Sequence, residues 1–247
     1  MSRAIEVFAR GFCFTRSITH PYLAGRVGPV WVVRDAPRKN GDYRNEQWIA
    51  HGVAPNEVDR IARQHTRGRF AVCAIHRIDE PDASLRTGFK SLGYRLWATE
   101  PFMVHRLKTI PRFDSPATIE RVTTKEVAAR LATATRSRPL ASQYFSRDSH
   151  LRQYVALISG KLVGWVRSIV IEDATWCANM YVMPCFRRRG IGRALLCRML
   201  RDDRDGGTKM AVLLASHTGA KLYPVVGYEQ IGTLLLFTPS KRGKKSP

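Results

Sequence analysis

The chain has 247 residues, of which 44% are hydrophobic, and this suffices for a packed core in one large or two small domains. Its 41 Lys and Arg residues exceed its 20 Asp and Glu residues, so the formal net charge is +21 and the surface attracts anions such as a phosphorylated cofactor or a nucleic acid. No stretch approaches eighteen consecutive apolar residues, and no convincing signal peptide is present, which argues against a membrane span and favours a cytoplasmic location.

The cysteines predict neither disulfides nor a metal site. Their number is odd, no two are spaced as C-x-x-C, and most fall in runs typical of strand or helix interiors. We therefore expect reduced, mostly buried thiols and no bound metal. The cysteines are Cys13, Cys73, Cys177, Cys185 and Cys197.

The first half of the chain predicts an alternation of strands and helices. Short runs rich in Val, Ile and aromatic residues predict strands, and runs with apolar residues three and four positions apart predict helices. The predicted strands are 30–35, 47–53, 69–76 and 101–107, and the predicted helices are 56–64 and 84–92.

The second half predicts a strand, a helix and then an antiparallel meander. The strand at 117–122 precedes a helix for which Thr123 and Glu126 form a capping box, with Val127 and Leu131 on its apolar face. The meander consists of two strands within 154–171, joined at Ser159–Gly160, and a third at 175–183 after the turn Glu172–Asp173.

Helices and strands alternate again toward the carboxyl terminus. A helix with Ile191, Leu195 and Met199 on its inner side ends before Gly206–Gly207. A buried strand, a short helix closed by glycine and a final strand follow at 209–216, 217–226 and 233–239. The predicted fold class is α/β of the α+β type, with a mixed, mostly antiparallel sheet flanked by helices.

A weak internal repeat relates the two halves. Three short landmarks recur in the same order, which indicates a diverged duplication. The landmarks are 53–55 beside 182–184, 70–72 beside 210–212, and 92–94 beside 226–228. Two prolines in the segment 108–116 mark the joint, so the predicted domains are 1–110 and 117–239, followed by a disordered basic tail at 240–247.

The stretch Arg187-Arg188-Arg189-Gly190-Ile191-Gly192 predicts an anion site between a strand and a helix. The first helical turn leaves N–H groups unpaired, glycines let a phosphate approach them, and arginines add charge. This site predicts a bound pyrophosphate. The stretch lacks G-x-x-x-x-G-K-[ST] and the full G-x-G-x-x-G, which argues against a nucleotide hydrolase or a dehydrogenase. A merely solvated basic turn is the alternative interpretation.

With these motifs the sequence resembles the GNAT superfamily of acyl-CoA-dependent N-acyltransferases. The motifs are Val182-x-Pro184, then Arg187-x-x-Gly190-x-Gly192, and then "ASHTGAKLYPVVGY" at 215–228. The resemblance covers 117–239 with every element in the family's order, and a weaker resemblance in the first half makes the whole chain similar to a tandem GNAT protein. It implies a GNAT-like fold in two repeats.

The resemblance implies an acetyl-CoA site in the second half. In the family the third meander strand separates from the strand at 210–216, the pantetheine arm enters between them, and the pyrophosphate lies on the helix N-terminus. His217 occupies a position that often contacts the cofactor, with helix capping or a surface role as alternatives. The implied cofactor-binding set is Tyr181, Val182, Met183, Arg187, Arg188, Arg189, Gly190, Ile191, Gly192, Arg193 and His217.

The resemblance also implies that Tyr223 protonates the leaving CoA thiolate, as a positioned weak acid can, while an ordinary core tyrosine is the alternative. Members of the family with a glutamate base would place it near Trp176, an indole that cannot accept a proton. Glu172 and Asp173 could act through water. Pro224 removes an N–H beside Tyr223 and could shift it.

The resemblance implies acetyl transfer from acetyl-CoA to a primary amine. The first half has no glycine directly after Pro55, so we expect it not to bind CoA but to support or shape the second half. One alternative is a basic nucleic-acid-associated protein, in its merged form an enzyme acting on aminoacyl-tRNA; another is a non-catalytic CoA sensor. The acceptor, the general base and the oligomeric state stay open.

Overall fold

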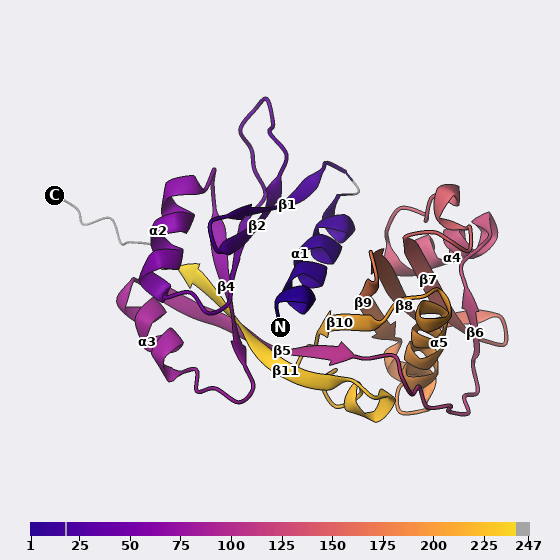
Figure 1. Ribbon diagram of the computed structural model, residues 1–247. Coiled ribbons are helices and arrows are strands. Elements are labelled where there is room, and N and C mark those ends of the chain that lie inside the picture. Colours follow the sequence, from indigo (N-terminus) through magenta and orange to yellow (C-terminus); the bar gives the residue numbers. More distant parts are fainter. Residues whose placement is uncertain (18, 241–247) are drawn as a thin grey trace. The chain divides into compact units, whose positions relative to one another are not determined.

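The computed structural model of the chain describes residues 1–17 and 19–240, and the chain forms two compact units (Figure 1). Neither unit is a continuous segment. Among the described residues, the first consists of Met1–Met103, Leu214–His217 and Gln230–Ser240, and the second of Val104–Leu213 and Thr218–Glu229. The last strand of the chain therefore belongs to the first unit. The predicted tail at 240–247 lies, except for Ser240, outside the described residues.

The first unit is a sheet with helices on both sides. The strands follow the order β1-β2-β3-β4-β11-β5. Helix α1 packs on β1 and β2, while apolar residues of α2 and α3 join the core formed by β2, β3, β4 and β11. The strands are β1 Tyr22–Val27, β2 Val30–Asp35, β3 Glu46–Ala50, β4 Phe70–Arg77, β5 Tyr94–His105 and β11 Glu229–Pro239; the helices are α1 Ser2–Arg16, α2 Pro55–His65 and α3 Ala83–Ser91.

The second unit is a sheet in the order β10-β9-β8-β7-β6. Strands β6 to β9 are antiparallel, and β10 pairs with β9 in parallel, as β4 does with β3 in the first unit. The strands are β6 Thr118–Arg121, β7 Leu151–Ile158, β8 Lys161–Ile171, β9 Ala174–Val182 and β10 Met210–Leu214; the helices are α4 Lys125–Thr135 and α5 Ile191–Asp205, with short 3₁₀ turns η1 Ser142–Tyr144, η2 Pro184–Phe186 and η3 Pro224–Val226. The predicted α/β class with a mixed, mostly antiparallel sheet is confirmed.

Helices α4 and α5 cover opposite faces of this second sheet. Trp165 of β8 pairs with Val155 of β7, and both belong to the core beneath α4. Ser168 of β8 points the other way and donates to the carboxylate of Asp203 in α5. Because strand side chains alternate between faces, the odd-numbered residues at the centre of β8 face α4 and the even-numbered ones face α5.

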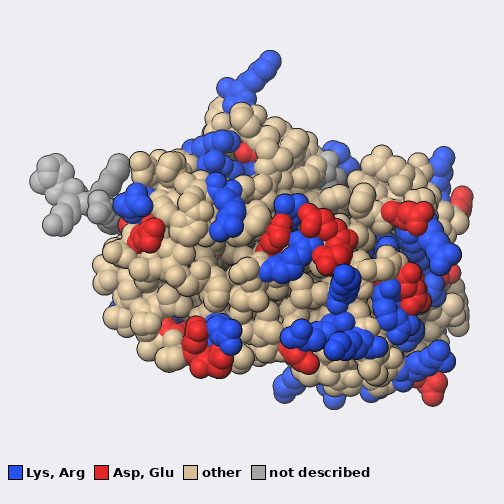
Figure 2. All heavy atoms as spheres, in the orientation of Figure 1, with Lys and Arg blue, Asp and Glu red and all other residues tan. Residues whose placement is uncertain are grey.

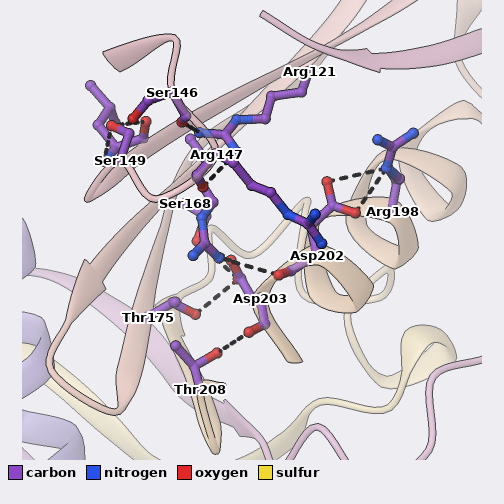
Figure 3. Close-up of polar contacts among 12 residues, drawn as sticks. Arg121, Ser146, Arg147, Ser149, Ser168, Thr175, Arg198, Asp202, Asp203 and Thr208 are labelled. Atoms are coloured by element: carbon purple, nitrogen blue, oxygen red, sulfur yellow. Dashed lines mark hydrogen bonds and ion pairs between the residues drawn. The ribbon is translucent and has the colours of Figure 1, made fainter. Parts of the chain in front are cut away.

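A buried carboxylate anchors the last turn of α5 to the sheet (Figure 3). Asp203 accepts hydrogen bonds from Ser168 at 2.8 Å and from Thr175 at 3.0 Å, and pairs with Arg152 at 3.0 Å. Burial raises the pKa of Asp203 to about 6, against the effect of these donors. The cluster ties α5 to β7, β8 and β9 and so fixes the direction in which the helix presents its amino-terminal turn.

Two local predictions in the second half are wrong. Helix α4 is capped by Thr124, whose side chain accepts from the N–H of Val127, and not by Thr123, because Thr124 is the last residue with an extended backbone. Residues 217–223 form turns rather than a continuous helix, and only Pro224–Val226 makes a 3₁₀ turn, because the proline has no N–H to continue an α-helix.

The surface and the thiols agree with the composition. All five cysteines are free thiols, and only Cys185 is exposed. Figure 2 shows Lys and Arg side chains interspersed with acidic and neutral ones on the face in view, so the excess positive charge there is not one unbroken area. Among the described residues, no helix combines the length and apolar character needed to cross a membrane.

Candidate functional site

Strands β9 and β10 part after a short paired stretch. Within the described residues, Met210–Val212 of β10 pairs with Ala174–Trp176 of β9. Strand β9 continues for six further residues, Cys177–Val182, beyond the last pair. The β10-facing backbone edge of these residues is left without a strand partner, which is the opening that an extended ligand with amide groups could enter.

A β-bulge marks the point where β9 leaves β10. Arg167 of β8 pairs with Ala178, whereas Trp165 pairs with Tyr181, so that β9 has one more residue than β8 between these pairs. Asn179 has a left-handed backbone with φ of 55°. Bulges bend a strand and increase its twist, which explains why β9 turns away here. Sequence reasoning missed the bulge; an Asn in mid-strand was its only signal.

Helix α5 begins directly after the basic loop. Gly190 is its N-cap, with φ of 80°, and Arg188 is also left-handed, with φ of 64°. A Cβ on Gly190 would lie 3.3 Å from the carbonyl oxygen of Asp114, so glycine suits both the conformation and the space. The N–H groups of the first turn of α5 have no intrahelical acceptor and point toward this loop.

The arginines of the loop differ in their contacts. Nε of Arg187 donates to the carbonyl oxygen of Val182 at 2.9 Å, and the guanidinium of Arg193 lies 4.7 Å from the ring centre of Phe113. Arg188 and Arg189 are exposed. The loop therefore has positive charge anchored beside β9 and exposed positive charge near the N-terminus of α5, where an anion is favoured.

The first turn of α5 lies beside the bulge and beside the segment with the candidate acid. A Cβ on Gly192 would be 3.2 Å from Cε of Met180 and 3.1 Å from a terminal carbon of Leu222. Gly192 thus allows three elements to approach closely: α5, the bulge of β9 and the turn that leads to Tyr223.

Tyr223 lies in a buried aromatic group on the α5 side. It is 7% exposed, and its ring packs edge-on against Tyr228 at 5.7 Å. Burial, with a smaller contribution from Cys177, raises the pKa of Tyr223 above its usual value, so the phenol is protonated at neutral pH. A protonated phenol next to the end of the strand opening is a suitable proton donor.

The turn after Tyr223 is fixed by His105. Gly227 has φ of 100°, and a Cβ there would lie 2.7 Å from Nε2 of His105, so only glycine fits. The N–H of Leu107 donates to Nδ1 of His105, which puts the ring proton on Nε2, and Nε2 donates to the carbonyl oxygen of Val226 at 3.1 Å. Burial lowers the pKa of His105, in keeping with a neutral ring. His105 was not singled out from the sequence.

The other residues predicted to bind the cofactor make contacts of different kinds. Met183 donates its N–H to Val163 and accepts from Phe186, so both of its backbone groups are engaged. Tyr181 stacks on Trp165 with ring centres 4.7 Å apart. His217 belongs to the first unit, where its Nε2 lies 3.1 Å from the hydroxyl of Thr99.

The residues considered for the base have ordinary structural places. Trp176 is buried and pairs with Ile169 of β8, on the sheet face that α4 covers. Glu172 has a left-handed backbone in the tight turn between β8 and β9, where Asp173 follows it. The turn position of Glu172 and Asp173 does not by itself give either carboxylate a catalytic geometry.

The equivalent place in the first unit is closed. Strand β3 pairs with β4 over all of its length, Glu46–Ala50 opposite Phe70–Ala74, and Nδ1 of His51 continues the contact to the carbonyl oxygen of Ile75 at 2.8 Å. The N-terminus of α2 is covered by α3, because a Cβ on Gly88 would lie 2.7 Å from the ring of Pro55. Among the described residues, this place therefore has neither a strand opening like that between β9 and β10 nor an open N-terminus of α2.

A mixed sheet whose two parallel strands part beside a glycine-capped helix is the architecture of the GNAT acyltransferase fold. Residues 149–230 match the family model for the acetyltransferase (GNAT) domain. The matched segment lies almost entirely in the second unit, so the similarity to a GNAT acetyltransferase domain falls on the unit that has the strand opening.

Solved structures show the same fold over most of the chain. A GCN5-related N-acetyltransferase from Kribbella flavida is similar over 98% of this chain and 96% of its own, with a TM-score of 0.65 and 18% identity. One from Sphaerobacter thermophilus covers 85% of this chain and 76% of its own, with a TM-score of 0.57 and 18% identity. A tandem GNAT protein from the clavulanic acid biosynthesis pathway covers 90% and 82%, with a TM-score of 0.53 and 13% identity. A search of curated proteins finds no match.

Proposed function

We propose that the protein transfers an acetyl group from acetyl-CoA to a primary amine at the second unit. The observation that supports this most directly is the parting of β9 from β10 at the bulge, beside the first turn of α5. One opening then accommodates an extended pantetheine arm, and the adjoining helix N-terminus accommodates a pyrophosphate.

The residues present fit acetyl-CoA. The N–H groups at the start of α5 would bind the pyrophosphate, with Arg188 and Arg189 adding charge from the loop. On β9 the N–H of Val182 would bind the arm, since Met183 already uses its own backbone groups within the chain. Acetyl-CoA supplies an acyl group activated as a thioester.

The chemistry is direct attack by a neutral amine. The amine nitrogen forms a bond to the thioester carbonyl carbon, the carbon–sulfur bond breaks, and the nitrogen loses one proton. Tyr223 donates its phenolic proton to the departing thiolate and regains, through water, the proton that the nitrogen loses. The overall reaction therefore releases no proton to the solvent. Its buried surroundings hold the proton until the thiolate forms.

We assign one acetyl-CoA to each chain and none to the first unit, whose strands stay paired and whose helix start is covered. Isothermal titration calorimetry with acetyl-CoA tests this assignment. Micromolar binding with a stoichiometry of one is expected, and absence of binding contradicts the proposal.

Turnover separates an enzyme from a CoA sensor. Release of free CoA in the presence of a panel of primary amines is expected, whereas tight binding without turnover for every amine would favour the sensor. A nucleic-acid role would be shown by RNA binding that weakens steeply as salt rises.

A further inference from the structure

Arg167, at the centre of β8, is a half-buried cation without an acidic partner. Its Nε donates to Oε1 of Gln153 at 3.0 Å, and burial lowers its pKa. Within residues 1–17 and 19–240, no carboxylate pairs with it, and its other N–H groups have no hydrogen-bond acceptor. A guanidinium stays charged in proteins, and the two Nη groups of Arg167 are not among the fully buried polar atoms, so they are open to a ligand. The fold therefore keeps a positive charge that a bound group could balance.

Gln153 positions this guanidinium without neutralising it. Its side chain is 1% exposed, and its Nε2 donates to the carbonyl oxygens of Val166 at 2.8 Å and Tyr154 at 3.3 Å. These bonds fix the amide so that Oε1 accepts from Arg167. A glutamate of the same shape would cancel the charge. The neutral amide leaves the outer edge of the guanidinium, with two parallel N–H groups, available.

Arg167 lies on the sheet face opposite α5. It pairs with Gln153 on β7 and with Ala178 on β9. Paired residues share a sheet face, so all three lie on the same face as Trp165. Tyr223 and the first turn of α5 lie on the other face, so an acceptor reaching the bulge from the Arg167 side would approach away from the CoA-binding loop.

A second polar donor on this face also lacks an acceptor. Trp165 is only 6% exposed, and its buried indole Nε1 has no hydrogen-bond partner in the part of the chain that is described. Buried donors in native proteins are almost always satisfied, by the chain, by water or by a ligand. The accessible Nη groups of Arg167 and the unsatisfied indole N–H of Trp165 occupy neighbouring positions of one strand face and together indicate a place for an oxygen-rich group.

We infer that the acceptor amine also has a free carboxylate, which Arg167 binds, so that the substrate class is amino acids or similar amino carboxylates. This inference rests on the proposed function. A carboxylate has one negative charge and two coplanar oxygens, which match one guanidinium and its two free N–H groups. A phosphate dianion would need a second cation, and no other charged group acts on Arg167.

Binding of the acylated product tests the inference without turnover. In the presence of CoA, calorimetry would compare a set of N-acetyl amino acids with their carboxamides, which differ only in the carboxylate. We expect the acids to bind at least tenfold more tightly than the amides to the wild-type protein. In Arg167→Gln the two should bind within about twofold, because the amide ligand keeps its affinity and the acid loses its partner.

Two further variants make the result specific. Gln153→Glu supplies the counter-charge inside the fold and should also remove the preference for acids while leaving Arg167 in place. Arg204→Gln, which removes an exposed arginine at the far end of α5, should leave the preference unchanged. Circular dichroism would verify that each variant is folded, and the CoA affinity of each should equal that of the wild type.

The outcomes are distinguishable from failure of the proposed function. Wild-type protein that binds CoA but shows no preference for acids overturns the carboxylate inference alone. A preference that survives in folded Arg167→Gln overturns the role of Arg167. Tighter binding of N-acetylphosphoethanolamine than of any acid would overturn the assignment of a carboxylate in favour of a phosphate. Absence of CoA binding overturns the proposed function itself, whereas the product comparison made without CoA still reports on Arg167.

Discussion

Replacing Gly190 with alanine should weaken acetyl-CoA binding through the geometry of the helix start. A left-handed backbone costs a residue with a Cβ about 1–2 kcal/mol relative to glycine. The new methyl group would also lie 3.3 Å from the carbonyl oxygen of Asp114, closer than an ordinary contact. Relief of both strains has to rotate the loop and re-aim the first N–H groups of α5. We expect at least a tenfold loss of acetyl-CoA affinity, which is ~1.4 kcal/mol.

Gly207→Ala is the matched control for this substitution. Gly207 follows the other end of α5 with φ of 86°, and a Cβ there meets nothing within 4 Å. Urea denaturation should show a similar loss of about 1–2 kcal/mol of stability for both variants. Calorimetry should show weaker binding for Gly190→Ala alone. Equal affinities in the two variants would refute the assignment of the anion to this helix start.

Replacing Gly192 tests the anion site less specifically than the motif alone suggests. A larger residue there meets the flexible ends of Met180 and Leu222 at 3.1–3.2 Å, and Leu222 adjoins Tyr223. A loss of activity in Gly192→Val would therefore mix an effect on phosphate binding with an effect on the candidate acid.

Two further predictions concern protons. Tyr223→Phe should lower kcat by roughly 100-fold with nearly unchanged acetyl-CoA affinity if the phenol protonates the thiolate, and full activity with every amine would identify Tyr223 as a packing residue. The pKa of Asp203 is about 6 in the fold against an ordinary 3.8, so its stabilising effect is complete below about pH 4 and is lost as the pH rises through 6. Between pH 4 and pH 7 the wild type should lose about 2 kcal/mol of stability relative to Asp203→Asn; parallel stability curves would contradict the raised pKa.

The motif order predicted the second unit well because its elements are locally encoded. The meander, α5 with its glycine start and the turn at Gly227 all have short-range signals, namely alternation, apolar spacing and left-handed glycines. The N-terminal helix α1 was missed, because Arg3 and Arg10 interrupt its apolar run. In the structure these arginines pair with Glu6 on the outer side, while Ile5 and Phe8 are buried.

Features made by pairs of distant residues could not be predicted. The unpartnered state of Arg167 depends on which residues face it across β7 and β9, and a strand register is a long-range property. The same holds for His105, which closes the turn at Gly227 from more than a hundred residues away in sequence. Neither residue belongs to a motif.

The place of the last strand makes a prediction about the two halves of the sequence. Gly232–Phe237 of β11 pairs with Val72–Arg77 of β4 in the first unit, and Leu234, Leu235 and Phe237 are buried there. Burial of one such side chain contributes about 1.5–3 kcal/mol, so the three together approach the whole stability of a typical domain. We therefore expect that neither 1–110, which lacks this inner strand, nor 117–239, whose last strand lacks its partner β4, folds alone. Circular dichroism and urea denaturation of the two fragments check this; cooperative unfolding of the isolated 117–239 fragment would show that the sequence repeat, and not the strand pairing, defines the folding unit.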